Sequence, residues 1–327
     1  MTFILFHELK IILSFLIIIF SISFAQSNIC HYCKKEIKGK YIQANGFKYH
    51  PNHFLCSYCN KPIKSSYVED ENKFYHQNCF KEFAYAKCDV CGEPLTGNFI
   101  IDSHGNEYHQ RHQNEYKICD ICGRIITDKI TGGGRALDDG RNQCNICRKE
   151  SIKSNKLYKS YLLNVINKMR NLGIRLDMNK INIKPVGRNE LKNIAGTMYS
   201  DDLRGFCNSN LRRNLNGELI NSKHTIYVLD NMPHEYTESI IAHELFHAWL
   251  RDNTNIEHSS LLEEGSCNYI SYQIMKNKNT YNSKVIIKNL EKDTSYIYGE
   301  GFRKVYKKFN GKYLVELLNY LKENDSI

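Results

Sequence analysis

The sequence predicts an α+β protein in which small metal-stabilised hairpins precede a domain built from a small sheet and several helices. Three observations support this fold class. Cys-x-x-Cys pairs recur along the first part of the 327-residue chain. Longer segments with helical or strand periodicity follow Arg148. A His-Glu-x-x-His pentapeptide then lies within an apolar helical segment, from Ile241 to Leu250.

The first 25 residues have the pattern of a secretory signal peptide. An apolar run extends from Ile11 to Phe24, and Ser23 and Ala25 occupy the small-residue cleavage positions. A retained membrane anchor is the alternative, but the run is shorter than the roughly 20 residues that a span needs. We therefore expect cleavage near Ala25 and a secreted or periplasmic mature protein that has no membrane contact after cleavage.

The formal net charge of +10 comes from Lys and Arg scattered along the chain. No dense basic run is present, so we expect a solvated surface and no nucleic-acid partner. The many Asn, Ile and Lys residues suggest a bacterial source with low-GC coding.

The 13 cysteines, an odd number in an exported chain, would suggest a disulfide framework, but their spacing indicates zinc instead. Two ligand pairs separated by a short hairpin make a closed tetrahedral zinc site. Two such sets, joined by two residues, are arranged as in a LIM domain, which we expect over residues 28–83. The fourth ligand of the first set is His where Cys is usual. The two sets are Cys30, Cys33, His50 and His53, then Cys56, Cys59, His76 and Cys79.

A second, looser copy is expected over residues 86–150. The first site of this copy, which is the third of the chain, could use His104 in place of His109. The segment Thr131–Arg135 is interpreted as a hairpin tip. Because such hairpins cannot bury a core, the metal would supply the folding energy. Cys207 and Cys267 remain as free thiols or a disulfide. The ligands of this copy are Cys88, Cys91, His109 and His112, then Cys119, Cys122, Cys144 and Cys147.

Residues 151–327 are expected to form the third domain. An amphipathic helix runs from Leu157 to Leu172. Strands are expected at 181–186, about 196–199 and 224–230. Further segments follow at 283–292 and 298–305, with a last helix from about Lys312.

The pentapeptide places His243 and His247 one turn apart on one helix face, the separation needed to hold a single zinc ion. Glu244 lies beside them and is placed to take a proton from water at the metal. Seventeen residues after His247, Glu264 lies on a second helix that Ser260 and Glu263 can open as a capping box.

This arrangement resembles the gluzincin metallopeptidases, whose third ligand is a Glu in a Glu-Gly or Asn-Glu context. The resemblance implies Glu264 as the ligand, with Glu263 as the alternative. Asn268, one turn further, could accept a hydrogen bond from a ligand histidine. Tyr298 and Arg303 are candidate donors to a developing oxyanion. In peptidases of this class, the strand corresponding to 224–230 is the sheet edge that binds substrate.

The combination of LIM-type modules with His-Glu-x-x-His-Ala-Trp-Leu-Arg, Glu-Glu-Gly-x-Cys and Tyr-Gly-x-Gly-Phe resembles the plant organ-size peptidases of the DA-one family. The likeness covers about residues 28 to 325. It implies a LIM region joined to a gluzincin-like zinc metallopeptidase domain. An apolar segment stands where that family has ubiquitin-interacting helices, so ubiquitin control is not expected to carry over.

We therefore expect a zinc metallopeptidase that hydrolyses peptide bonds in a protein or peptide substrate. It would hold one catalytic and about four structural zinc ions, and its LIM-like modules would dock a protein partner, regulate the enzyme or stiffen the entry to the cleft. The alternative is a zinc-dependent LIM adaptor protein whose peptidase domain is inactive. The two hypotheses differ in what they require of the peptidase motif, because an inactive adaptor has no reason to retain it. The residues concerned are His243, Glu244, His247 and Glu264.

Overall fold

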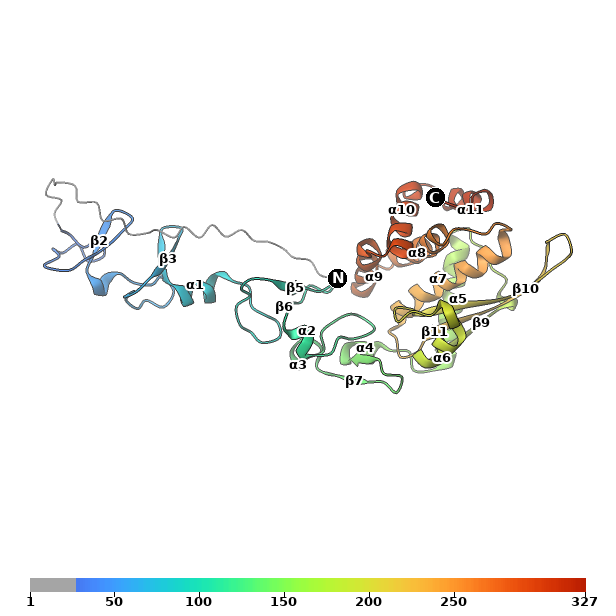
Figure 1. Cartoon of the computed structure of the whole chain (residues 1–327), viewed down its shortest axis with the longest axis horizontal. Helices are drawn as coiled ribbons and strands as arrows, with labels where there is room; N and C mark the ends of the chain where they lie inside the picture. The colour runs from blue at the N-terminus through green and yellow to red at the C-terminus, as the bar shows by residue number, and fades with distance from the viewer. Residues whose placement is uncertain (1–27) are drawn as a thin grey trace. The chain divides into compact units, whose positions relative to one another are not determined.

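The computed structural model describes residues 28–327, so the expected signal peptide lies outside the described residues. The chain divides into two units (Figure 1): residues 28–101 with Asn106–His112, and Asp102–Gly105 with Gln113–Ile327. The expected α+β class is confirmed, because metal-binding hairpins precede a mixed helix and sheet domain. Among the described residues, no helix combines the length and apolarity needed to cross a membrane.

The first unit consists of short antiparallel hairpins. Its first two modules share a small core that includes Tyr49, Phe54 and Phe74, whose rings contact one another. So small a core fits the expectation that bound metal supplies much of the stability. The elements are β1 (Ile42–Ala44) with β2 (Phe47–Tyr49), η1 (Pro51–His53), β3 (Tyr67–Asp70) with β4 (Lys73–His76), α1 (Gln77–Ala84), and β5 (Phe99–Ile101) with β6 (Glu107–His109).

The second unit begins with the fourth cysteine module. The expected hairpin tip at Thr131–Arg135 is wrong. Thr131 ends a short helix, and Gly134 already begins the next strand, so the tip is residues 137–141. The boundary expected at residue 150 stays a prediction. The elements of this module are α2 (His112–Glu115), which starts at the end of the first unit, α3 (Asp128–Thr131), β7 (Gly134–Ala136), β8 (Asn142–Cys144) and α4 (Asn145–Glu150).

A three-stranded sheet forms one layer of the second unit. Its order is β10 (Gly205–Arg213), β11 (Leu219–Leu229) and β9 (Ile181–Val186), with β10 antiparallel and β9 parallel to β11. The strand expected at 181–186 is confirmed. The strand at 224–230 is also present, but it lies in the centre of the sheet, so the expectation that it forms the edge is wrong.

Two further differences from the expected structure lie between β9 and β11 in the chain. The expected strand at 196–199 is instead the 3-10 turn η3 (Gly196–Met198), which ends helix α6 (Arg188–Ala195) and begins at a glycine with φ of +56°. The edge strand β10 was not expected, because its exposed polar positions hide the strand pattern.

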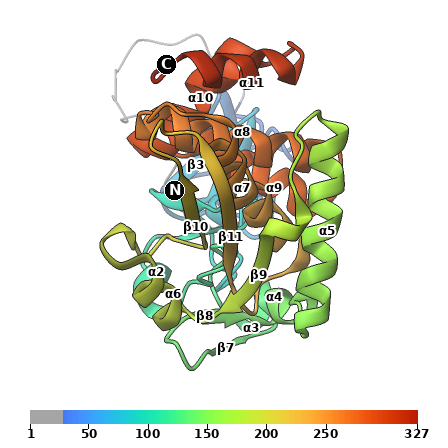
Figure 2. The same ribbon diagram turned by 90° about the vertical axis from the view of Figure 1, so that its right-hand side faces the viewer.

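Helices pack behind the sheet, and Figure 2 shows α7 (His234–Asn253) and α8 (Ser260–Lys276) there, with α5 (Asn155–Asn171) beside β9. Twelve of the 20 residues of α7 are buried, because α5, α8, α9 and the sheet all contact it. The expected capping box at the start of α8 is wrong: Ser259 is the cap and its hydroxyl accepts from the Leu262 N–H. The last elements are α9 (Tyr281–Lys292), the π-helical turn η4 (Tyr296–Glu300), α10 (Gly301–Phe309) and α11 (Leu314–Glu323).

Candidate metal centre

Three side-chain atoms from α7 and α8 converge on one point. His243 Nε2 lies 3.0 Å from Glu264 Oε2 and 3.3 Å from His247 Nε2. His247 Nε2 lies 3.5 Å from the same carboxylate oxygen. Tetrahedral zinc with bonds of about 2.0–2.1 Å holds its ligand atoms about 3.3 Å apart. The three atoms therefore fit a zinc ion.

Outer hydrogen bonds orient both histidine rings. The Nδ1 of His243 donates to Asn268 Oδ1 at 2.9 Å, which confirms the expected role of Asn268. The Nδ1 of His247 donates to Glu263 Oε1 at 2.9 Å, and Arg251 donates to the same oxygen at 2.7 Å. In the neutral tautomer that donates from Nδ1, the Nε2 atom carries a lone pair and is directed at the metal position. Glu263 is thus engaged behind the ring of His247, and the geometry favours Glu264 as the ligand.

Charge supports the same assignment. Burial opposes ionisation of Glu264, but hydrogen bonds and charge from His243 and His247 outweigh it and hold the pKa of this carboxyl well below its usual range. The buried thiol of Cys267 also lies within 4.8 Å of ring nitrogens of both histidines. We assign the third position to Glu264, because its Oε2 lies 3.0 and 3.5 Å from the two Nε2 atoms, close to a tetrahedral separation.

Glu244 is buried beside the centre, against the edge strand. Burial raises the pKa of its carboxyl, and charge from the two histidines offsets part of that shift. A Cβ atom at Gly205 would lie 2.8 Å from Glu244 Oε1 and 2.4 Å from the Ile240 side chain. Only glycine therefore allows β10 to pass this close to the proposed base.

The π-helical turn η4 brings Tyr298 to the same site. Burial and the charges of Glu264 and Glu244 raise the pKa of its hydroxyl to about 12, so it stays protonated and able to donate. Asn268 Nδ2 donates to the Tyr298 carbonyl at 3.3 Å. Arg303, the other expected oxyanion donor, instead forms an ion pair with Glu300 at 3.0 Å and is therefore engaged elsewhere.

Close backbone contact between α8 and the start of α10 fixes this arrangement. A Cβ atom at Gly265 would lie 2.3 Å from the carbonyl carbon of Gly301. One at Gly299 would lie 2.1 Å from the Asp293 carbonyl oxygen. The glycines of the Glu-Glu-Gly and Tyr-Gly-x-Gly segments thus hold Glu264 and Tyr298 together. Sequence reasoning used these glycines only as family motifs and assigned them no packing role.

The remaining expected ligands form four separate clusters. In the first three, a cysteine sulfur lies 3.5 Å from a histidine Nδ1, in the pairs Cys33–His50, Cys59–His76 and Cys91–His109. In the fourth, sulfur pairs lie 3.8 and 3.9 Å apart, close to the roughly 3.8 Å that 2.3 Å Zn–S bonds impose and far from a disulfide at about 2.05 Å. All 13 cysteines are free. The clusters are Cys30, Cys33, His50 and His53; Cys56, Cys59, His76 and Cys79; Cys88, Cys91, His109 and His112; and Cys119, Cys122, Cys144 and Cys147.

Backbone N–H groups prepare these thiols for metal. His50 N–H donates to Cys30 Sγ at 3.3 Å, and His76 N–H to Cys56 Sγ at 3.4 Å. Although burial opposes ionisation, such bonds lower the pKa of the two thiols to about 5 and about 6. The third site uses His109, because the Nε2 of His104 lies 2.9 Å from the Cys122 carbonyl oxygen instead.

The fold and these clusters define a protein with LIM-type Cys/His modules suited to zinc and an α+β domain that carries a candidate His-His-Glu metal centre. Residues 30–84 match the model of the LIM domain, and residues 217–288 match the DA1-like model, described as Protein DA1. These matches support the resemblance to the DA1-like LIM proteins.

Three plant proteins illustrate this similarity. The LIM domain-containing protein HDR3 of Oryza sativa subsp. japonica is 27% identical, over 90% of this chain and 72% of its own length. Protein DA1-related 1 of Arabidopsis thaliana is 27% identical over 91% of this chain and 60% of its own length. Protein DA1 of the same plant is 24% identical over 69% of this chain and 53% of its own length. The chain thus spans little more than half the length of some relatives.

Proposed function

We propose that this chain is a zinc-dependent metallopeptidase that hydrolyses peptide bonds in protein substrates. The observation that carries the proposal is the triangle formed by His243 Nε2, His247 Nε2 and Glu264 Oε2, with separations of 3.0 to 3.5 Å beside the buried Glu244. A structural zinc site has four protein ligands, whereas three protein ligands with one open position are typical of catalytic zinc.

Each residue then has a separate task. His243, His247 and Glu264 would hold zinc, which when bound acts as a Lewis acid on water and on the substrate carbonyl. Glu244 would accept the proton of the attacking water and return it to the leaving amine. The Tyr298 hydroxyl would donate to the developing oxyanion. The edge of β10 would bind the peptide as an added strand, because this strand, and not β11, lies at the edge and contacts Glu244.

The first unit would serve protein docking. LIM domains typically mediate protein–protein interaction, and residues 30–84 match that domain. This match also favours the alternative that the chain is a zinc-dependent adaptor protein whose peptidase domain is inactive. Both hypotheses include about four structural zinc ions, so the metal-binding hairpins do not distinguish them.

Glu244→Gln tests the proposal. The amide keeps the volume of the side chain but cannot accept the proton, so we expect peptide cleavage to fall about 10²–10⁴-fold while all metal is retained. A proteome-derived peptide library read by mass spectrometry would first provide a substrate. Glu238→Gln is the matched control, because Glu238 is a buried carboxylate on the same helix that pairs with Lys168 and Lys278.

Three outcomes would contradict the proposal. If Glu244→Gln cleaves at the wild-type rate with zinc bound, Glu244 is not the base. If the wild-type protein holds zinc at the His-His-Glu centre and cleaves no peptide in the library, the adaptor hypothesis is favoured. If Glu238→Gln loses as much activity as Glu244→Gln, the loss reflects a general need for buried carboxylates on this helix and not a role of Glu244 as base.

A further inference from the structure

The fourth cysteine cluster lies in the same unit as the His-His-Glu centre. Its ligands Cys119, Cys122, Cys144 and Cys147 belong to the hydrophobic core that also contains most of the buried apolar side chains of α7. The cluster is thus packed into the domain that carries the candidate active site. The contacts that join the two metal sites are specific and polar.

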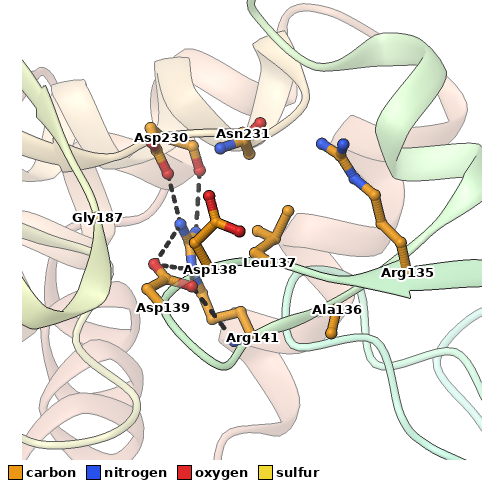
Figure 3. A pocket seen from close by; sticks show the side chains of 9 residues that line it. All are labelled: Arg135, Ala136, Leu137, Asp138, Asp139, Arg141, Gly187, Asp230 and Asn231. Atoms are coloured by element: carbon orange, nitrogen blue, oxygen red, sulfur yellow. Dashed lines mark hydrogen bonds and ion pairs between the residues drawn. The ribbon is translucent and has the colours of Figure 1, made fainter.

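Arg141, from the tip of the β7–β8 hairpin, makes the first connection (Figure 3). Only 1% of its side chain is exposed, and it pairs with Asp139 at 2.8 Å and with the Asp230 carboxylate. Its Nη1 also donates to the Asp230 carbonyl oxygen at 2.9 Å. These groups line a pocket of about 310 Å³ between the hairpin and the ends of β9 and β11. Asp230 directly follows β11 and begins the turn that leads into α7.

Gln143 makes the second connection, next to the metal ligand Cys144. It is fully buried, and its Nε2 donates to the Asn231 carbonyl oxygen at 2.7 Å. The Ser151 hydroxyl lies 2.7 Å from that oxygen and 2.7 Å from the carbonyl oxygen of Cys147, a second ligand of the cluster. Asn231 has a left-handed φ of +56°, a conformation that non-glycine residues keep only when their surroundings hold it.

The backbone completes the attachment. The Ile152 N–H donates to the Met232 carbonyl oxygen at 3.1 Å, and Ser151 forms a bridge with Pro233, the residue before α7. Residues 230–233 are therefore held by Arg141 and Gln143 of the cysteine module and by Ser151 and Ile152, which directly follow it. Without the metal, the hairpin that carries Arg141 and Gln143 would keep its two-stranded pairing, which is marginal on its own. It would also keep the contacts of Arg188 with Asp120 and Asp139.

We propose that Arg141 and Gln143 are positioning residues for the helix that carries His243 and His247, and that the metal at the fourth cluster holds them in place. His243 lies nine residues into α7, about 14 Å from its start at 1.5 Å per residue. A helix transmits a tilt at its first turn over that distance. Loss of metal from the cysteine cluster therefore loosens the His-His-Glu centre, although no ligand is shared.

Hydrogen–deuterium exchange of zinc-loaded protein, read on peptides that cover residues 230–245, tests this proposal without any substrate. It therefore stands apart from the proposed peptidase activity. Arg141→Met should speed exchange in these peptides at least tenfold, whereas peptides from α11 should change less than twofold. Arg148→Met is the matched control, because Arg148 is an exposed arginine of the same cysteine module, on α4, and no hydrogen bond or ion pair links it to the turn among the described residues. It should change neither region more than twofold. Arg141→Lys, which keeps one ion pair, should restore part of the protection.

A second pair of variants tests the metal itself. Cys119→Ser with Cys122→Ser should speed exchange in residues 230–245 at least tenfold. Cys30→Ser with Cys33→Ser, the equivalent change in the other unit, should leave it within twofold. The proposal is overturned if Arg141→Met leaves exchange in residues 230–245 unchanged or speeds it equally in α11. It is also overturned if the two cysteine pairs act alike. If the Cys119 variant does not fold, the arginine pair alone decides.

Discussion

Gly265→Ala should destabilise the second unit, although alanine is the better helix former. In an exposed helix interior, replacing glycine by alanine stabilises by about 0.5–1 kcal/mol. Here the added Cβ would lie 2.3 Å from the Gly301 carbonyl carbon, where ordinary contact begins at 3.4 Å. Because backbone atoms cannot rotate away, α8 and α10 must separate by about 1.1 Å. Overpacking of this kind costs about 1–3 kcal/mol or more, so the sign of the effect is reversed.

The displacement also has a predicted effect on activity. Glu264 precedes Gly265 on α8, and Tyr298 lies three residues before Gly301. A misplacement of about 1 Å between reacting groups costs about 100-fold in rate. We therefore expect the melting temperature, measured by calorimetry, to fall by about 2–4 °C for each kcal/mol of lost stability. We also expect the rate of peptide cleavage to fall about 100-fold.

Ser266→Ala is the control for this prediction. Ser266 is the next residue of α8, and its buried hydroxyl has no hydrogen-bond partner among the described residues. Removal of this hydroxyl should leave the melting temperature unchanged or slightly raised. A rise in melting temperature for Gly265→Ala would refute the close approach of the two helices. The same result would also refute the explanation of how Glu264 and Tyr298 are held together.

Three further predictions follow from the metal sites and the N-terminus. Metal analysis by mass spectrometry should find five zinc ions per chain, four structural and one catalytic; a value near one, with Cys30 and its partners in disulfides, would contradict the LIM interpretation. Tyr298→Phe should lower kcat for peptide cleavage by about 10²–10³-fold with little change in KM, because an oxyanion donor acts in the transition state; an unchanged kcat would exclude that role. We also propose export with cleavage after Ala25, so N-terminal sequencing of exported protein should begin at Gln26, and material beginning at Met1 would contradict it.

The sequence was sufficient wherever a pattern is local. The strand Ile181–Val186 was predicted with its observed bounds, because β-branched residues alternate there between turn-forming segments. The ligand clusters could be predicted because metal geometry fixes the spacing of the paired ligands. His243 and His247 could be predicted to share one metal ion, because the geometry of a helix alone determines their separation.

Features that depend on distant contacts could not be predicted. The residue spacing alone does not distinguish Glu263 from Glu264, and only the family resemblance favoured Glu264. The choice depends on which carboxylate meets the Nε2 atoms and which meets Nδ1 of His247. The partnership of Arg141 with Asp230 joins residues 89 positions apart. The edge strand β10 forms because β11 and α7 contact it, and its own sequence has little strand preference.

The polarity of that edge strand has a consequence for solubility. An exposed sheet edge offers unpaired backbone groups to any extended chain, including another copy of the same protein, and so favours aggregation. On β10 the outward positions Asn208, Asn210 and Arg212 are exposed and polar, and Arg213 adds a second charge at its end. Two copies brought edge to edge would have to bury these groups and oppose like charges. The polar side chains that hide the strand pattern in the sequence should thus also oppose self-association at this edge.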